Sequence, residues 1–376
     1  MNTKDAFLAL NLLPNIGPVR VRHLLRRFGR PEQILSASPD ALRSVSGIGE
    51  EMASQIVKWE DSIDLAEEKR RMEEHGIETL TLDDDRYPPA LREIHDPPFL
   101  LYLKGTLRPS DAAAIGVVGS RRTTHYGKEQ AKKLSFRLAR AGFCIISGLA
   151  RGIDTAAHEA ALAAEGRTIA VLGSGIGHIY PPENQALADR IAESGAVLSE
   201  FPVLYVPDRK SFPLRNRIVS GLSQGLLVIE APSRSGSLIT ANQALEQGRS
   251  VFAVPGPIDR PTSEGCNRLI QQGAKLVCSA EDVVEELSHE INSLPLDFEP
   301  ESWDPAEGSN DQVTPSPELS EAESLLLDQL DGRELTIDAL CDFTGMPSGI
   351  VSAHLLQLEM KAAVKQLPGK YFTKLI

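Results

Sequence analysis

The central part of this chain alternates short apolar segments, rich in β-branched residues, with helical segments, and this alternation restricts the fold more than any other feature. Repeated strand–helix units of this kind build a parallel sheet with crossover helices on its faces. The expected strands are residues 115–118, 144–146, 168–172, 197–198, 226–229, 251–253 and 275–277. Segments 77–82 and 99–103 either add strands or cover the front of the sheet. We therefore predict an α/β protein with a parallel sheet core in residues 81–290.

Residues 1–80 are expected to form a helical domain that contains two similar turns, at residues 13–19 and 45–51. Both turns resemble the helix-hairpin-helix element of SAM-like domains, in which a G-x-G turn directs backbone N–H groups at a phosphate. The first turn has Asn15 in place of the first glycine, and the second is followed by Glu50 and Glu51, which would repel a phosphate. We favour a structural or partner-docking role for this domain over contact with DNA.

The C-terminal part divides into a linker and a small domain. Residues 291–317 are rich in Pro, Ser and acidic residues without helical or strand periodicity, which is typical of a flexible, self-repelling linker. Residues 318–376 predict three helices, at 319–330, 335–343 and 348–360, followed by a hairpin, and this order indicates a winged helix. The third helix has no Lys or Arg, so we expect it to dock a protein rather than read DNA.

The net charge of −13 does not argue against an anionic ligand, because the charge is concentrated in one segment. The chain has 39 basic and 52 acidic residues, and residues 297–342 alone contain 14 acidic residues and one basic residue. A basic site elsewhere is therefore possible.

Other features of the sequence suggest a cytoplasmic protein without a bound metal or cofactor. No apolar run is long enough to span a membrane, and the N-terminus lacks the apolar core of a signal peptide. The four cysteines form no close pair, so neither a zinc site nor a disulfide framework is expected.

Several of the predicted strands run directly into loops of small and basic residues. The carboxyl ends of parallel strands meet at one edge of a sheet, where helix N-termini also offer N–H groups to phosphate. The loop residues that would line an anion-binding groove at this edge are Gly119, Ser120, Arg121, Ser147, Gly148, Gly173, Lys210, Phe212, Arg215, Asn216, Arg217, Ser235, Gly236 and Ser237.

Enzymatic motifs are incomplete in this sequence. It has no G-x-x-x-x-G-K-[ST] loop, the glycines at 173–177 lack the last position of G-x-G-x-x-G, and the H-E-x-x-H pattern that begins at His158 ends in Leu162. Asp154 and His158 lie one helical turn apart and could form an acid/base pair, but Asp154 as a helix N-cap is the simpler interpretation. We expect no catalytic residues.

Eight segments match the motifs of one known family in order. They are residues 86–88 (RYP), 117–121 (VVGSR), 147–154 (SGLARGID), 179–184 (IYPPEN), 212–221 (FPLRNRIVSG), 235–241 (SGSLITA), 254–256 (VPG) and 265–270 (GCNRLI). On these residues the chain resembles the DNA-processing protein A (DprA/Smf) family. The resemblance implies an extended Rossmann-like domain that binds single-stranded DNA without cutting it. It also implies a homodimer that protects incoming DNA, displaces single-strand-binding protein and loads RecA recombinase during natural transformation.

The resemblance maps a dimer contact near Leu269, Ile270 and Ala274, although these apolar residues could equally pack in the core. In the groove, Arg121 and Lys210 would hold phosphates, and Phe212 would either stack on a base or pack its loop onto the core. Arg217 would add charge, unless it forms an internal salt bridge, for example with Glu230.

An enzyme with a related fold is the main alternative, namely a nucleoside-monophosphate phosphoribohydrolase of the lysine-decarboxylase-like group. These enzymes carry P-G-G-x-G-T-x-x-E, whose glutamate helps catalysis. The nearest segment here, residues 232–240, has Thr240 in place of that glutamate.

Overall fold

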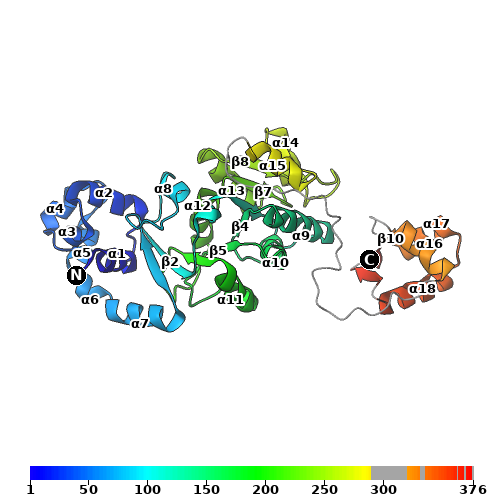
Figure 1. The fold of residues 1–376 in the computed structure, drawn as a ribbon, viewed down its shortest axis with the longest axis horizontal. Coiled ribbons are helices and arrows are strands. Elements are labelled where there is room, and N and C mark those ends of the chain that lie inside the picture. Colours follow the sequence, from blue (N-terminus) through cyan, green and yellow to red (C-terminus); the bar gives the residue numbers. More distant parts are fainter. Residues whose placement is uncertain (289–319, 331–334, 362, 368–369, 375–376) are drawn as a thin grey trace. The chain divides into compact units, whose positions relative to one another are not determined.

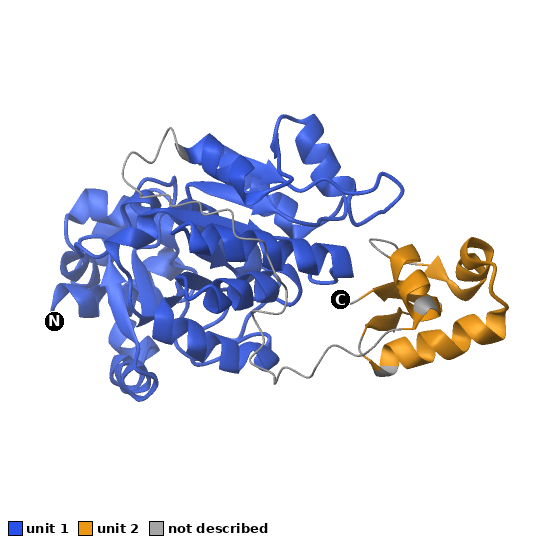
Figure 2. Ribbon diagram, turned by 45° about the vertical axis from the view of Figure 1, so that its right-hand side comes forward, with its two compact units in different colours: residues 1–308 blue, residues 309–376 orange. Residues whose placement is uncertain are grey.

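The computed structural model describes residues 1–288, 320–330, 335–361, 363–367 and 370–374, and the chain forms two compact units, residues 1–308 and 309–376 (Figure 2). The boundary predicted between residues 80 and 81 lies inside the first unit. The predicted linker, residues 291–317, lies outside the described residues. In the part of the chain that is described, no helix is long and apolar enough to cross a membrane.

The N-terminal segment is helical, as expected. It contains α1 (Thr3–Leu12), α2 (Pro18–Phe28), α3 (Pro31–Leu35), α4 (Pro39–Arg43), α5 (Glu50–Val57), α6 (Trp59–Ser62) and α7 (Leu65–His75) (Figure 1). Gly17 and Gly49 are the N-caps of α2 and α5, and two residues earlier Asn15 and Gly47 have φ angles of 61° and 85°. Because asparagine tolerates the left-handed region better than most residues, Asn15 replaces the glycine of the first turn without changing its backbone.

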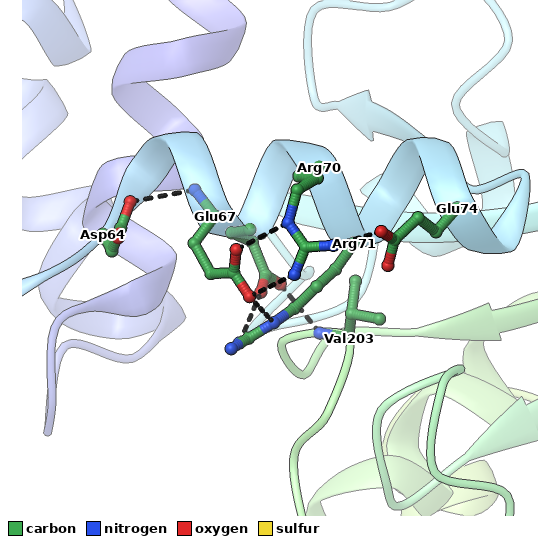
Figure 3. Close-up of polar contacts among 7 residues, drawn as sticks. Asp64, Glu67, Arg70, Arg71, Glu74 and Val203 are labelled. Atoms are coloured by element: carbon green, nitrogen blue, oxygen red, sulfur yellow. Dashed lines mark hydrogen bonds and ion pairs between the residues drawn. The ribbon is translucent and has the colours of Figure 1, made fainter.

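Helix α7 contacts the loop that contains Val203 (Figure 3). Its exposed side carries ion pairs among Glu67, Arg70, Arg71 and Glu74. On its inner side the buried carboxylate of Glu68 accepts a hydrogen bond of 2.8 Å from the backbone N–H of Val203. An exposed set of ion pairs contributes little to stability, whereas the buried hydrogen bond of Glu68 joins this helix to the Val203 loop.

A nine-stranded sheet forms the core of the first unit. Its strands are β1 (Glu78–Thr81), β2 (Leu100–Gly105), β3 (Ala114–Val118), β4 (Cys144–Ser147), β5 (Thr168–Leu172), β6 (Ala196–Ser199), β7 (Gly225–Val228), β8 (Ser250–Ala253) and β9 (Lys275–Leu276). Their order is β1-β2-β6-β5-β4-β3-β7-β8-β9. The seven predicted strands are confirmed, and they form the parallel part. Segments 77–82 and 99–103 provide β1 and β2, which extend the sheet in antiparallel pairing.

Helices cover both faces of this sheet, because its strands carry mainly apolar side chains on both sides. One face packs against α9 (His125–Arg140), α10 (Ile153–Ala163), α11 (Gln185–Ser194) and α15 (Ala280–Ser288). The other packs against α8 (Pro89–Arg92), α12 (Ser211–Leu222), α13 (Gly236–Glu246) and α14 (Glu264–Gln271). In β3, for example, Ile115 and Val117 lie on the first face, and Ala114 and Val118 on the second. Two short 3-10 turns, Pro109–Ala112 and Pro182–Asn184, complete the unit.

The strand order reverses next to β3. Strands β3 to β6 follow one another towards one edge of the sheet, whereas β7 and β8 lie on the other side of β3. The register pairs Ile115 with Ile145 of β4 on one side and with Gly225 of β7 on the other. Ligands of open α/β sheets bind outside the carboxyl ends of the strands at such a switch point. The topology therefore predicts a binding site at the loops after β3 and β7.

The second unit is a small winged helix. It contains α16 (Glu321–Gln329), β10 (Leu335–Thr336), α17 (Ile337–Thr344), α18 (Ser348–Met360), β11 (Val364–Leu367) and β12 (Tyr371–Lys374), with the sheet order β10-β12-β11. Its core includes Leu326, Leu340, Val351, Leu358 and Phe372. The prediction that a helix starts at residue 335 was wrong by two residues, because Leu335 and Thr336 pair with β12 instead.

Candidate functional site

A cavity of about 800 Å³ opens at the switch point of the sheet. It lies between the loops that follow β3 and β7 and the N-terminal ends of α12 and α13. Nine of the fourteen residues predicted from sequence line it, namely Gly119, Ser120, Arg121, Phe212, Arg215, Asn216, Ser235, Gly236 and Ser237. We refer to this cavity as the groove.

The loop after β3 is a tight turn that places two arginines at the rim of the groove. The Ser120 N–H donates to Glu230 O (2.7 Å), and the Ser120 hydroxyl is bonded to both the N–H (3.1 Å) and the carbonyl (2.9 Å) of Arg122. A side chain at Gly119 would collide with Ile153, since its Cβ would lie 2.5 Å from that residue. The turn therefore leaves Arg121 and Arg122 exposed, with their guanidinium groups available to an anion.

Two aromatic rings and one guanidinium group lie in contact along the groove. The Arg121 Cζ lies 4.8 Å from the ring centroid of Phe212, and the Phe212 ring lies 5.8 Å from that of Tyr180 at an interplanar angle of 49°. The Phe212 ring also rests on Gly173, where an added Cβ would come within 2.8 Å of it. Both interpretations of Phe212 thus have structural support, because the ring packs on its loop and lies beside Arg121 in the groove.

The floor of the groove contains a buried cation, Arg215. Its Nη1 donates to the carbonyl of Gly148 (2.5 Å) and to that of Val171, and its Nε donates to Asn216 Oδ1 (3.1 Å). Burial lowers the pKa of Arg215 to about 10, which still leaves it charged at neutral pH. Gly148 is required here because a Cβ would lie 2.1 Å from Nη1. Arg215 therefore supplies charge beneath the groove, and its guanidinium group is held by protein carbonyls.

Asp154 and His158 do not form an acid/base pair. Gly152, not Asp154, is the N-cap of α10, so the N-cap prediction was wrong. The Asp154 carboxylate accepts from the N–H groups of Gly148 (3.1 Å) and Ala150 (3.3 Å), and burial raises its pKa. His158 is bonded through Nδ1 to Thr168 Oγ1 (2.7 Å), and burial lowers its pKa to about 3. Both side chains hold the fold together.

Arg217 is turned away from the groove. Its buried guanidinium group pairs with Glu200 and, through Nε, with Asp96 Oδ2 at 3.1 Å. An internal salt bridge was one of the two predictions, but the suggested partner Glu230 was wrong. Glu230 instead accepts hydrogen bonds from the hydroxyls of Thr123 (2.6 Å) and Thr124 (2.9 Å). Burial also raises the pKa of Glu200, while the charge of Arg217 opposes that rise.

Of the remaining predicted residues, Lys210 and Ser147 lie outside the groove lining, whereas Ser235 and Ser237 belong to it. Lys210 is exposed at the N-terminus of α12, where its N–H donates to Asp208 Oδ1 (2.8 Å). Ser147 is buried and its hydroxyl donates to Val117 O (2.6 Å). At the N-terminus of α13, the hydroxyl of the N-cap Ser235 accepts from the Ser237 N–H (3.3 Å).

The sequence-based selection missed twelve of the described residues that line the groove, and besides Arg122 three of them carry the aromatic or basic chemistry of the site. Tyr180, Arg209 and Arg234 all belong to its walls. Tyr180 stands in the segment 179–184 and the two arginines adjoin the selected residues 210 and 235, so extending each segment by a few residues would have found them.

The three residues of the predicted dimer contact lie on and after α14. Leu269 is buried in the core, and Ile270 and Ala274 are half-buried against it. Core packing accounts for Leu269, and a dimer contact through the other two residues stays a prediction.

The fold and the groove define the chain as a Rossmann-like α/β protein with a cavity lined by basic and aromatic residues at its switch point, combined with helical and winged-helix segments. Sequence comparisons find the family described as DNA recombination-mediator protein A at residues 78–288, a DprA winged helix domain at 310–370 and a SAM-like helix-hairpin-helix tandem at 7–58. The chain belongs to the DprA/Smf family, whose members process DNA in recombination.

Individual relatives agree with this assignment. Protein Smf of Synechocystis is 36% identical over 99% of both chains. The crystal structure of DNA processing protein A from Streptococcus pneumoniae is similar with a TM-score of 0.68 and 37% identity, covering 76% of this chain and 99% of that one. DNA processing protein A from Helicobacter pylori, described by its single-stranded DNA binding mode, has a TM-score of 0.52 and 31% identity over 57% of this chain and 96% of its own.

Proposed function

We propose that the groove binds single-stranded DNA and that the protein acts through this binding without catalysing a reaction. The observation that carries the proposal is the contact among Arg121, Phe212 and Tyr180 at the switch point. Exposed guanidinium groups attract phosphates, and aromatic faces stack on bases of any identity. The bases of a duplex are already stacked on one another, so an aromatic platform favours a single strand. The binding mode named for the Helicobacter pylori relative supports this choice.

The proposed biological role follows that of the family. The protein would protect incoming single strands in the cytoplasm, displace single-strand-binding protein and load RecA recombinase during natural transformation and recombination. We further propose a homodimer formed near Ile270 and Ala274, and separate roles for residues 1–80, 81–290 and 318–376. The helical and winged-helix parts would dock proteins, while the central part would hold the strand.

The chemistry of the groove disfavours the hydrolase alternative. A phosphoribohydrolase needs a free carboxylate near the ribose, and Thr240 occupies the nearest position, with its hydroxyl 3.4 Å from Gly236 O. Asp154 is the single carboxylate among the described residues of the lining, and two backbone N–H groups already occupy it.

A salt titration of oligonucleotide binding tests the proposal. Contact with about four to six phosphates predicts a slope of roughly −3 to −4 in a plot of log affinity against log salt concentration. The Arg121→Ala variant should bind about tenfold or more weakly, because a charge-assisted hydrogen bond and the guanidinium–aromatic contact are both lost. Arg140→Ala is the matched control, since Arg140 is an exposed arginine at the C-terminus of α9, at the opposite edge of the sheet.

Three outcomes would contradict the proposal: a slope near zero, equal affinity for duplex and single strand, or equal losses in the two variants. Incubation with adenosine monophosphate should release no free base, and release of adenine would favour the hydrolase.

A further inference from the structure

A second cavity, of about 490 Å³, opens farther along the two helices that form one wall of the groove. The N-terminal ends of α12 and α13 line the groove. This second cavity is lined instead by Arg217 of α12 and by Gln243 near the C-terminal end of α13. The segment after α8 closes its other side. The two cavities share no lining residue, but Gln243 Nε2 donates to the carbonyl of Pro213 in the groove wall (3.2 Å). They are therefore neighbours along one surface.

The four polar side chains on the inner side of this cavity are each anchored to the protein, and each has at least one buried atom without a hydrogen-bond partner in the part of the chain that the structure describes. Gln247 Nε2 donates to Arg217 O (3.1 Å), and Arg249 Nη2 donates to Ala90 O (3.1 Å). The buried polar atoms without a hydrogen-bond partner among the described residues include Nη1 of Arg217, Nε of Arg249, and Oε1 of both Gln243 and Gln247. Arg217 is only 4% exposed. Because buried polar groups normally have partners, this arrangement of two donors and two acceptors points to a ligand that offers both.

The charges around the cavity restrict that ligand further. Asp96 lines the cavity, and the exposed carboxylates of Glu93 and Glu246 lie at its rim. Three carboxylates beside two guanidinium groups disfavour a phosphate. An uncharged, planar group that carries donors and acceptors along one edge fits this set, since glutamine amides and arginine guanidinium groups are the side chains that pair with the edges of bases. The cavity volume also lies in the range of sites for small molecules.

We propose that this second cavity binds a nucleobase of the same single strand whose backbone passes through the groove. The inference rests on the proposed function, because it requires a strand in the groove. The base enters by its donor–acceptor edge, while the acidic rim keeps the phosphates outside. The groove then supplies affinity that is independent of sequence, and the cavity adds a contact that depends on a base being present at one position of the strand.

The test compares two long oligonucleotides with the full-length protein by fluorescence anisotropy. One is an intact strand of about twenty nucleotides, and the other keeps about six bases to fill the groove and is abasic elsewhere. A base edge that pairs with two side chains should make the intact strand bind about fivefold to 100-fold more tightly than the abasic strand. This comparison needs no protein variant, so it cannot fail through misfolding.

The double variant Gln243→Met and Gln247→Met removes the free acceptors but keeps side chains that favour a helix. In this variant the ratio of the two affinities should fall to near one. The matched control is Asn242→Met, which changes an exposed polar residue of the same helix outside both cavities and should keep the wild-type ratio.

The outcomes separate this inference from the proposed function. A ratio of one in the wild-type protein, or the same ratio in the double variant and in the wild type, overturns the assignment of the second cavity. The first of these results is expected if the cavity receives a cationic side chain of a partner protein instead. Binding of a short oligonucleotide that depends on Arg121 would then still support the groove. If no single strand binds at all, both proposals fail.

Discussion

Two glycines of the groove should respond in opposite ways to the same added methyl group. Gly148 and Gly236 were both predicted to line the anion-binding groove. In the structure, Gly148 is packed against the guanidinium group of Arg215, whereas an added Cβ at Gly236 meets nothing within 4 Å. We therefore predict that Gly148→Ala destabilises the fold and that Gly236→Ala does not.

The size of the effect at Gly148 follows from the contacts of Arg215. A methyl group at residue 148 would lie 2.1 Å from Nη1 and 2.4 Å from Cζ, far inside the optimum of about 3.5–4.0 Å for carbon contacts. The guanidinium group cannot move away without breaking its hydrogen bonds to Gly148 O and Val171 O. Overpacking costs about 1–3 kcal/mol, and losing a hydrogen bond from a charged group costs about 1.5–3 kcal/mol. Together these losses lower the free energy of unfolding by about 3–6 kcal/mol.

Thermal unfolding followed by circular dichroism measures the difference. In large domains each kcal/mol of destabilisation lowers the Tm by at least about 2 °C, so Gly148→Ala should lower the Tm by roughly 6–12 °C. Gly236→Ala lies in the first turn of α13, where alanine is favoured over glycine by up to about 1 kcal/mol, so its Tm should stay the same or rise slightly. A Gly148→Ala protein that melts within about 2 °C of the wild type would refute the packing argument.

Three further predictions concern other buried contacts. Gly173→Ala places a methyl group 2.8 Å from the Phe212 ring, so it should weaken single-strand binding in anisotropy titrations while costing only about 1–3 kcal/mol of stability; unchanged affinity would argue against a role for the ring. His158 has a folded pKa of about 3 against 6.5 in the unfolded chain, so the unfolded state takes up the proton first as the pH falls. The free energy of unfolding should fall by up to about 1.4 kcal/mol per pH unit below pH 6.5, and urea unfolding of His158→Leu should lack this part of the slope. Hydrogen bonds from Lys361 and Ser320 lower the pKa of Glu323 to about 2 from 4.5, so its stabilising contribution is present above pH 4.5 and is lost as the pH falls towards 2. Lys361→Met should raise this pKa towards 4.5 in a carboxyl NMR titration, and a value that stays near 2 would show that Lys361 is not the cause.

The order of strands and helices could be predicted from sequence because each signal is local. The apolar segments that became β3 to β8 are short, bounded by small residues and separated by helical patterns, and their predicted limits agree with the structure to within one residue. The antiparallel pairing of β1 and β2 was left open, since pairing depends on which distant strand lies beside each segment.

The orientation of individual side chains could not be predicted in the same way. Arg215 and Arg217 stand two residues apart in a helix and look alike in sequence, yet one lies under the groove and the other pairs with Glu200. A basic residue is buried or exposed according to the acceptors that other segments bring to it, here carbonyls of Gly148 and Val171 and a carboxylate at residue 200. The residue types therefore predicted where the groove lies, whereas tertiary contacts determine which arginines line it.

The two outer strands of the large sheet have a consequence for how the protein behaves at high concentration. An exposed strand edge is a template for pairing with another chain, and it leads to aggregation when it is long and flat. At one end β9 has only two residues, and its Lys275 is paired with Glu286 (3.0 Å). At the other end, the Thr79 carbonyl of β1 accepts a hydrogen bond from Lys4 Nζ (3.4 Å). With one edge short and charged and the other partly occupied, separate copies have little tendency to pair through their sheets at high concentration.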